Sequence, residues 1–177
     1  SLISGRHQPE SRGLIGLLAD RLVLRTDLSS SPSFRELLSR LGQVAVGAYS
    51  HQGMPFEKLV EELQPERDLS RPPLYQVGLR VLDSADGPPA LPGMMVEPFS
   101  VPVTWSRADV TLQVQEQDDG VQLELVYRPD LFDQGRMVEM LEQLRYLLGQ
   151  IAKDPEMPFE SYSLVTPGAR QLLPDPE

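Results

Sequence analysis

A hairpin signal in the second half of the chain limits the folds that this protein can adopt. Residues 109–115 and 121–127 each alternate apolar and polar side chains, a pattern typical of strands that are buried on one face. The dipeptide Asp119-Gly120 lies between them, and it favours the positive φ angles of a type I′ turn. We therefore expect the two strands to pair antiparallel.

Two long amphipathic helices are predicted on either side of this signal. The first begins after Ser33, which can form a capping box with Glu36, and its apolar positions recur every three or four residues as far as Ala48. The second begins at Asp133, keeps the same spacing to Ile151 and ends soon afterwards. An apolar stripe on each helix indicates that both pack against other elements.

Shorter patterns complete the expected fold. Residues 14–24 are rich in Leu and β-branched side chains and predict a strand that is buried on both faces. Residues 56–63 predict a short helix, residues 74–82 a strand, and the Pro- and Gly-rich residues 83–93 a loop. The resulting order, β, α, α, β, β, β, α, predicts an α+β fold in which helices cover one face of a mixed or antiparallel sheet.

The composition indicates one globular unit and excludes several kinds of partner. The 177 residues, 40% of them apolar, suffice for a single core. The formal net charge of −10 would repel a phosphate backbone, so nucleic acid and anionic membrane are not expected partners. Cysteine is absent, which excludes disulfides and a Cys nucleophile, and no apolar run is long enough to span a bilayer. A soluble cytoplasmic protein is therefore expected.

His51 is the one residue with an obvious catalytic use, since a neutral imidazole can accept a proton near pH 7. A general base needs an orienting partner, and the sequence around His51 shows none. A structural or exposed His in a loop is the alternative. The carboxylates of Glu57, Glu61 and Glu62 fit the solvated face of a short helix, and the sequence offers no spacing of ligands for a metal.

Arg67, Asp68 and Arg71 alternate in charge within a few residues. They predict a local, salt-bridged loop, while the alternative is an Arg that orients a carbonyl or a phosphate. Tyr75 and Trp105 could stack on a ligand, although aromatic residues beside strands usually belong to the core. Taken without any family, these residues indicate a soluble α+β domain.

Two short signatures in the centre of the chain resemble the carboxyl-terminal half of a condensation domain of nonribosomal peptide synthetases. Residues 51–60 are similar to the family's HQDxPFEKLV motif, and residues 67–74 are similar to its RDLSRNPL motif. Further similarities extend over nearly the whole chain. Residues 13–25 resemble the family's IGxFVNTLxLR segment, and residues 32–38 resemble the element that follows it. Residues 108–112 resemble the FDLTL strand, and residues 131–133 and 154–155 resemble the end of the domain.

This resemblance implies a chloramphenicol-acetyltransferase-like half-domain. The family joins two such lobes in a V, and the phosphopantetheine arms of two carrier proteins meet in a tunnel between them, where an amine attacks a thioester to form an amide. Residues 1–156 would be the carboxyl-terminal part of the domain and residues 157–177 a linker towards an adenylation domain. The implied partners are the amino-terminal lobe, peptidyl carrier proteins and the adenylation domain, and no cofactor would be bound by this chain itself.

The family's catalytic motif, HHxxxDG, does not occur in the sequence, so the resemblance implies that the chain is inactive alone. No catalytic residue and no metal ligand is assigned. The residues expected to line the tunnel or the lobe interface are Gly16, Asp20, Arg25, His51, Gln52, Pro55, Phe56, Arg67, Asp68, Arg71 and Asp109.

The chain departs from the family pattern in several places. It carries Ala19-Asp20-Arg21 where the family has Val-Asn-Thr, Gly53 where Asp is common, and Pro72 where Asn is usual. Asp20 and Arg21 could satisfy each other as a buried ion pair, whereas an unpaired Asp20 would resist desolvation. Pro72 removes a backbone donor.

Two alternative functions remain open from the sequence. The first is a non-catalytic lobe that docks a carrier protein, a tailoring enzyme or an adenylation domain. The second is a compact acyltransferase that uses His51 as a base across an oligomer interface. Because a lobe without its partner exposes apolar surface, self-association is also expected.

Overall fold

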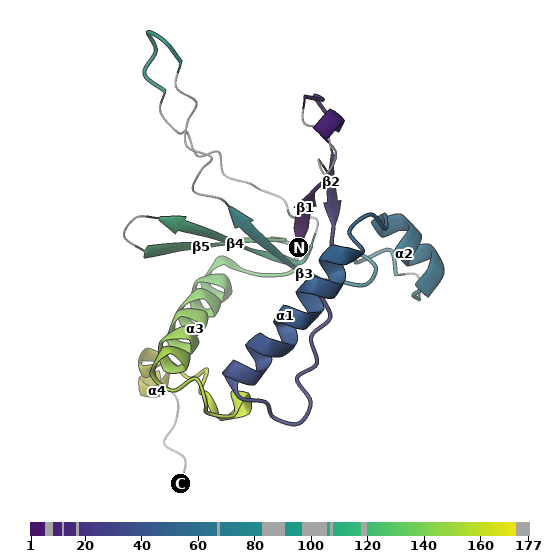
Figure 1. The fold of residues 1–177 in the computed structure, drawn as a ribbon. Coiled ribbons are helices and arrows are strands. Elements are labelled where there is room, and N and C mark those ends of the chain that lie inside the picture. Colours follow the sequence, from purple (N-terminus) through teal and green to yellow (C-terminus); the bar gives the residue numbers. More distant parts are fainter. Residues whose placement is uncertain are drawn as a thin grey trace. The chain divides into compact units, whose positions relative to one another are not determined.

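The computed structural model describes residues 1–5, 9–11, 13–16, 18–66, 68–82, 91–96, 106, 108–117 and 120–172. They belong to two compact units (Figure 1). The strand unit comprises residues 1–23 and 54–132 and contains both sheets. The helical unit comprises residues 24–53 and 133–177.

A three-stranded mixed sheet forms the centre of the strand unit. Its strands are β3 (Val77–Leu82), β4 (Val110–Gln117) and β5 (Gly120–Tyr127), in the order β3-β4-β5. Strand β3 runs parallel to β4, and β4 pairs antiparallel with β5. The expected antiparallel pairing is therefore confirmed, and Gly120, expected in the turn, is the first residue of β5, where it pairs with Gln117. Residues 118 and 119 lie outside the described residues, as do residues 83–90 of the expected loop.

The sheet is buried most deeply at the end where β4 begins and β5 ends. Ala108, Val110 and Val126 are all buried there, and the carbonyl of Gln76 accepts backbone hydrogen bonds from Asp109 (2.9 Å) and Val110 (3.3 Å). The loop before β4 is thus tied to the start of β3 at the end of the sheet where the core lies.

The expected strand over residues 14–24 is largely wrong. Only β2 (Ala19–Arg21) is a strand, and it pairs antiparallel with β1 (Leu2–Ser4), which the sequence pattern did not reveal. Leu14 and Ile15 are exposed. The Leu-rich pattern indicated burial on both faces, but among the described residues this sheet has two strands, and these two side chains remain open to solvent.

Both long helices of the helical unit begin as predicted. Helix α1 (Phe34–Ser50) starts with a complete capping box, in which Glu36 N–H donates to Ser33 Oγ (3.2 Å) and Ser33 N–H donates to Glu36 Oε2 (2.9 Å). Helix α3 (Gln134–Lys153) starts at Asp133, whose carboxylate accepts from the N–H of Arg136 (2.9 Å). Short-range capping chemistry therefore fixes where each helix starts.

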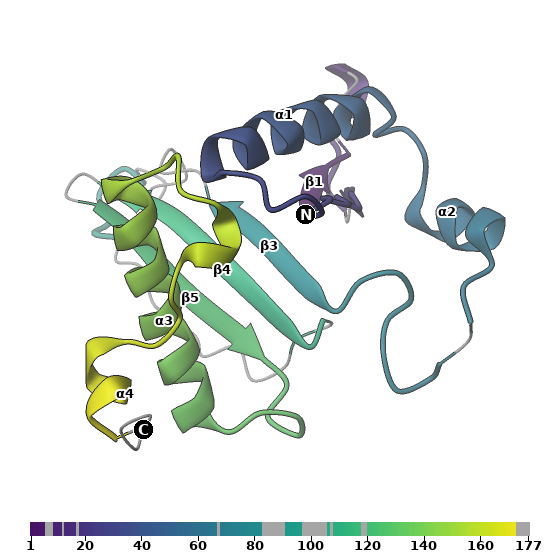
Figure 2. The same cartoon turned by 90° about the horizontal axis from the view of Figure 1, so that it is seen from below.

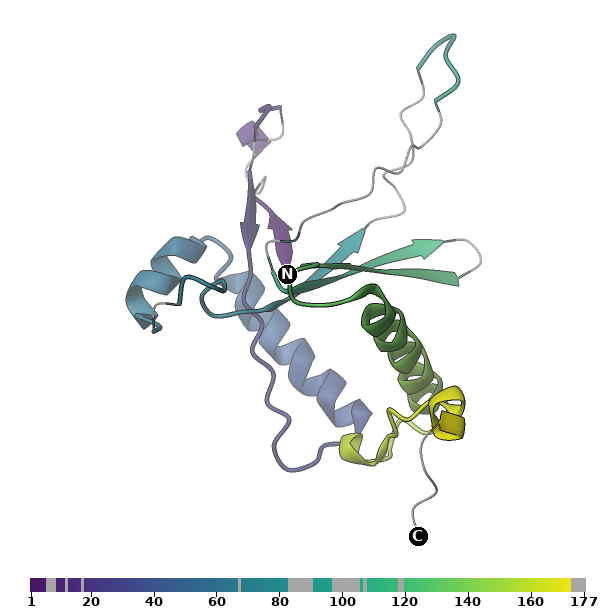
Figure 3. The ribbon, with the colours of Figure 1, turned by 180° about the vertical axis from the view of Figure 1, so that it is seen from behind.

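Backbone hydrogen bonds join the residues after α3 to the start of α1. Phe159 N–H donates to the carbonyl of Pro32 (2.8 Å), and Arg35 N–H donates to that of Pro155 (3.2 Å), so the two segments lie side by side (Figures 2 and 3). The side chain of Arg35 also pairs with Glu156. Pro32 is fully buried at this junction.

The last described residues form η2 (Phe159–Ser161) and α4 (Pro167–Leu172). Tyr162 is buried and donates its hydroxyl to the carbonyl of Asp154, and Gln150 exchanges two hydrogen bonds with the backbone of Ser163 (2.7 and 3.1 Å). Residues 157–163 therefore contact the end of α3. The assignment of residues 157–177 to a linker stays a prediction.

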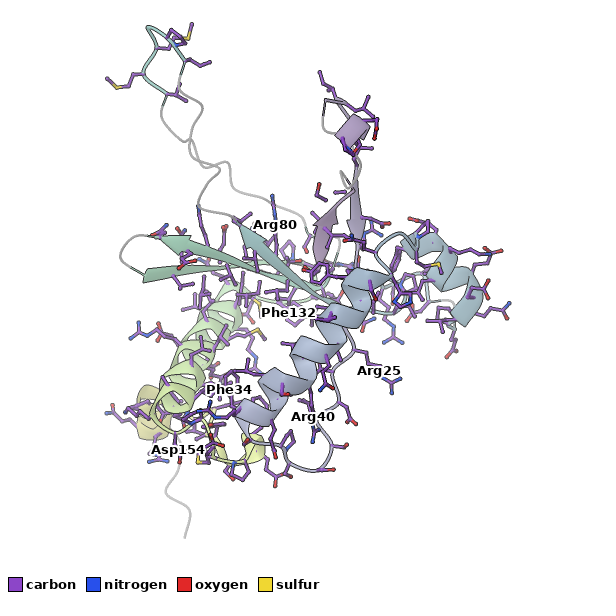
Figure 4. All side chains as sticks on the ribbon, viewed as in Figure 1. Arg25, Phe34, Arg40, Arg80, Phe132 and Asp154 are labelled. Carbon is purple, nitrogen blue, oxygen red and sulfur yellow. The ribbon has the colours of Figure 1, made fainter. Side chains whose placement is uncertain are left out.

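The side chain of Arg40 fastens the loop that precedes α1. Its guanidinium donates to the carbonyls of Asp27 (3.2 Å) and Ser29 (3.0 Å), and Figure 4 shows the side chain on the lower half of the helix. None of the described helices combines the length and apolar content that crossing a membrane requires.

Candidate functional site

Phe56 is the centre of an aromatic cluster in the strand unit. It is the first residue of helix α2 (Phe56–Leu63), whose bounds are those predicted, and only 5% of it is exposed. Its ring meets that of Tyr75 edge-on, with centroids 5.7 Å apart. The guanidinium of Arg21 lies over the Phe56 ring, 5.3 Å from its centroid. This Phe56 cluster (Arg21, Phe56 and Tyr75) joins three segments that are separate in the sequence.

The structure shows neither of the two arrangements that the sequence suggested for Asp20 and Arg21, a buried ion pair or an unpaired Asp20. Asp20 Oδ1 accepts a hydrogen bond from the backbone N–H of Arg21 (2.7 Å), and both residues are partly exposed. The guanidinium of Arg21 is placed over the ring of Phe56. A cation over an aromatic face is a favourable contact, so the unusual Arg at this position packs with the residue at the start of α2.

Asp68 and Arg71 form the local, salt-bridged loop that the sequence predicts. The carboxylate of Asp68 accepts from the hydroxyl (2.6 Å) and the N–H (2.9 Å) of Ser70, and Arg71 Nε lies 2.8 Å from its second oxygen. These hydrogen bonds, first that of the Ser70 hydroxyl, hold the pKa of Asp68 below its usual value. Arg67 lies outside the described residues.

Arg128 was missed by the sequence analysis, and it connects this loop to the sheet. Its guanidinium donates to the carbonyl of Ser70 (3.0 Å) and makes two bonds to Asp130 (2.6 and 3.2 Å). Its backbone N–H donates to the carbonyl of Asp109 (3.0 Å). The nearby Asp130 in the sequence could have indicated the local pair, but no sequence signal indicates a contact with Ser70, which lies 58 residues away.

Asp109 has a carboxylate that is largely buried. Its Oδ1 is shielded from solvent and has no hydrogen-bond partner among the described residues, and Arg128 Nη1 lies 3.9 Å from it. At that distance the attraction is electrostatic and no direct hydrogen bond forms. Asp109 and Arg128 are therefore coupled mainly through the backbone.

His51 caps the carboxyl end of α1. Its Nδ1 lies 2.8 Å from the carbonyl oxygen of Gly47, and since a carbonyl only accepts, Nδ1 carries the proton. The hydroxyl of Ser50 lies 3.1 Å from the same nitrogen. The ring is exposed, and the adjacent Gln52 donates its N–H to the carbonyl of Tyr49 (3.3 Å). This arrangement fits the structural alternative for His51.

The remaining candidates stay apart from these contacts. Pro55 is the N-cap residue of α2, and Gly16 is exposed in the segment before β2. Arg25 is exposed in the helical unit, where its charge helps to lower the pKa of Asp27 after the larger effect of hydrogen bonds from Ser29 (Figure 4). Within the described part of the chain, no group of three or more His, Asp or Glu side chains could hold a metal ion.

The free energy of unfolding should depend on pH through the carboxylates of Asp68 and Asp130. The pKa values of Asp68 and Asp130 are both lowered, the latter mainly by the hydrogen bond from Arg128. A carboxylate whose pKa is lower in the folded state stabilises the fold above the unfolded value of about 4 and loses this contribution as the pH falls through the folded value. The free energy of unfolding should therefore fall between about pH 5 and pH 3, as measured by urea titration at each pH.

The double variant Asp68→Asn, Asp130→Asn separates the contribution of these two groups to the pH dependence of stability from that of the other carboxylates. It should be less stable than the parent at pH 7, and its stability should change less over the same acid range. Parallel profiles for the two proteins would show that neither carboxylate contributes.

The family model described as "Condensation domain" matches residues 1–173. The probable non-canonical nonribosomal peptide synthetase CymA of Salinispora arenicola is 37% identical over 97% of this chain, and chondramide synthase cmdD of Chondromyces crocatus is 36% identical over 96% of it. The chain spans only 2% and 4% of the length of these two relatives.

Solved structures show the same fold. The X-domain from teicoplanin biosynthesis superposes with a TM-score of 0.79 at 32% identity, over 92% of this chain and 38% of that one. A complex of the X-domain and OxyB from the same biosynthesis gives 0.74 at 33% identity, over 86% and 34%. The four-domain synthetase AB3403 gives 0.82 at 20% identity, over 94% and 14%, which supports the fold alone. The predicted α+β, chloramphenicol-acetyltransferase-like architecture is confirmed.

Proposed function

The chain belongs to the condensation-domain family of nonribosomal peptide synthetases, and from this membership we propose that it is the carboxyl-terminal lobe of such a domain. In the intact domain, an amine held on one carrier protein attacks the thioester held on another. The new C–N bond replaces the C–S bond, and the phosphopantetheine thiol leaves. The lobe would supply one wall of the tunnel in which these arms meet.

The observation that carries this proposal is the contact between the family-like signatures. The Phe56 cluster joins the segment around Arg21 to the first central signature and to Tyr75, the residue that follows the second one. Arg128 holds Ser70 of the second signature and also bonds the backbone of Asp109. Segments that resemble one family's motifs are thus in direct contact within the fold. Their contacts are structural, so we propose that these signatures shape the lobe and that the reacting groups lie elsewhere.

We propose that the chain does not catalyse amide formation alone. Its two histidines, His7 and His51, are not adjacent, so HHxxxDG is missing from these residues. His51 caps α1 through Nδ1, which leaves Nε2 able to accept a proton, so the proposed inactivity rests on the missing motif and not on the geometry of His51.

The test is an amide-forming assay with the chain, a donor-loaded carrier protein and an acceptor-loaded carrier protein, with products detected by mass spectrometry. We expect no product above the uncatalysed rate, because the sequence lacks the HHxxxDG motif that the resemblance assigns to catalysis. An intact two-lobed condensation domain with the same carriers is the positive control. Product formed by the chain alone, and lost in His51→Ala, would instead establish a compact acyltransferase.

A non-catalytic docking lobe is the second candidate function. It is favoured by the similarity, at 32–33% identity, to the X-domain of teicoplanin biosynthesis, which one structure shows in complex with OxyB. On this proposal the chain would bind a tailoring enzyme, a carrier protein or an adenylation domain. Saturable binding of one of these to the immobilised chain would favour docking, and no binding at high concentration would count against it.

A further inference from the structure

A groove lies between helix α2 and the segment that leads from it to β3, all within the strand unit. Its volume is about 1060 Å³. One wall is a single face of α2, made by Glu57, Val60 and Glu61, and it is continued by Gln64, the C-cap residue of the helix. The other wall is made by Pro65, Glu66, Asp68, Leu69, Arg71, Pro72, Pro73, Leu74 and Gln76. Sites for small molecules are typically about 300–1,000 Å³, so this open groove suits a segment of polypeptide.

The groove is acidic. Glu57, Glu61, Glu66 and Asp68 line it, and Arg71 is the one basic side chain among its described lining residues. Arg71 is bonded to Asp68 and so does not neutralise the helix wall. Over residues 57–71 the sequence contains five acidic and three basic residues, in a chain of net charge −10.

Glu61 can exchange its present partner. Lys58 Nζ lies 3.1 Å from Glu61 and 3.3 Å from Glu62, so it serves two carboxylates at once, and all three side chains are largely exposed. Exposed pairs of this kind contribute little, so a cation from another molecule could replace Lys58 at small cost. Glu57 and Glu61 lie one helical turn apart on the groove face, which sets the spacing of the cations that would match them.

Leu69 supplies an apolar contact at the rim of the groove. It is fully exposed, although the residues on both sides of it are fixed. Asp68 accepts two hydrogen bonds from Ser70, and the carbonyl of Ser70 is held by Arg128. The turn therefore presents a Leu side chain to solvent in a defined position, beside Pro72 and Pro73. Little conformational entropy would be lost when a partner covers it.

We propose that this groove binds a basic segment of a partner protein. Lys or Arg side chains about one helical turn apart would pair with Glu57 and Glu61, and an apolar side chain of the same segment would cover Leu69. Acidic and phosphate-bearing partners are disfavoured by the same carboxylates. The proposal does not depend on the assignment to a catalytic domain, because it concerns binding to the chain itself.

The probe is a fluorescein-labelled helical peptide of about 15 residues with Lys pairs at i, i+4 and Leu on the adjoining face. Its binding to the chain is measured by fluorescence anisotropy at about 0.1 M salt, where exposed charges are only partly screened. The variant Glu57→Gln, Glu61→Gln should weaken binding about tenfold, the sum of two exposed ion pairs. Leu69→Ala should weaken it about fivefold through lost apolar burial.

Matched controls separate the groove from general attraction to an acidic protein. Glu139→Gln, Glu142→Gln on α3 removes the same charge outside the groove lining, and Leu172→Ala removes another exposed Leu. Both should leave binding within about twofold of the parent. Equal losses in the groove and control variants, equal binding of a peptide with Glu in place of Lys, or no saturable binding would each overturn the proposal.

Discussion

Phe56→Ala is expected to lower the free energy of unfolding by about 3–5 kcal/mol, because it deletes a buried aromatic side chain and leaves a cavity. Only 5% of Phe56 is exposed, and its ring contacts both Tyr75 and Arg21. The loss includes the edge-on aromatic contact as well as the buried area. Urea denaturation followed by circular dichroism measures it.

The matched control is Leu63→Ala on the same helix. Leu63 is the last residue of α2 and is exposed, so its truncation should cost less than about 1 kcal/mol. If Phe56→Ala were no more destabilising than this control, the Phe56 cluster would not contribute measurably to the stability of the strand unit.

Met137→Ala is expected to produce the largest loss in the helical unit, about 2–5 kcal/mol. Met137 lies in the first turn of α3 and is only 3% exposed. Its truncation leaves neighbouring atoms without contacts that the rest of the unit cannot readily restore. The same urea denaturation, followed at a wavelength that reports helix, measures the effect.

Met140→Ala provides the same chemical change three residues further along α3. Met140 is 39% exposed, so the expected loss is below about 1 kcal/mol. Because the two variants have the same composition and replace the same side chain within one helix, a difference between them isolates burial. Equal losses would contradict the assignment of Met137 to the core.

The helices and the hairpin could be predicted because their determinants are local. Ser33 and Glu36 are three residues apart and fix the start of α1, and Pro65 follows the short helix over residues 56–63. The paired strands, residues 110–117 and 120–127, are only two residues apart in the sequence. In each case the interacting groups are close in the sequence, so a pattern of a few residues contains the information.

The incorrect prediction of a strand over residues 14–24 shows that a local apolar pattern does not by itself establish burial. Apolar composition indicates that a segment prefers burial, but burial also requires another layer of structure. Leu14 and Ile15 have the composition of a core strand and are exposed. We propose that they meet the rest of a condensation domain, which would explain an apolar pattern that this chain does not bury.

The sequence identified several residues of the candidate site, but it did not show which of them contact one another. Asp68 and Arg71 pair as expected because they are three residues apart. His51 belongs to the helical unit and caps α1, while Phe56, only five residues later, belongs to the strand unit. One signature thus has two structural roles, a distinction that the linear motif does not contain.

The sequence by itself determined the helix starts, the hairpin, the acidic charge and the resemblance to condensation domains, since each depends on residue types at short spacing. Only the tertiary structure decided that Arg21 lies over Phe56 and that Arg128 holds the carbonyl of Ser70. These contacts join residues 35 and 58 positions apart, and at such separations many pairings are equally compatible with the residue types. Chain folding selects among them through the shared burial of whole elements.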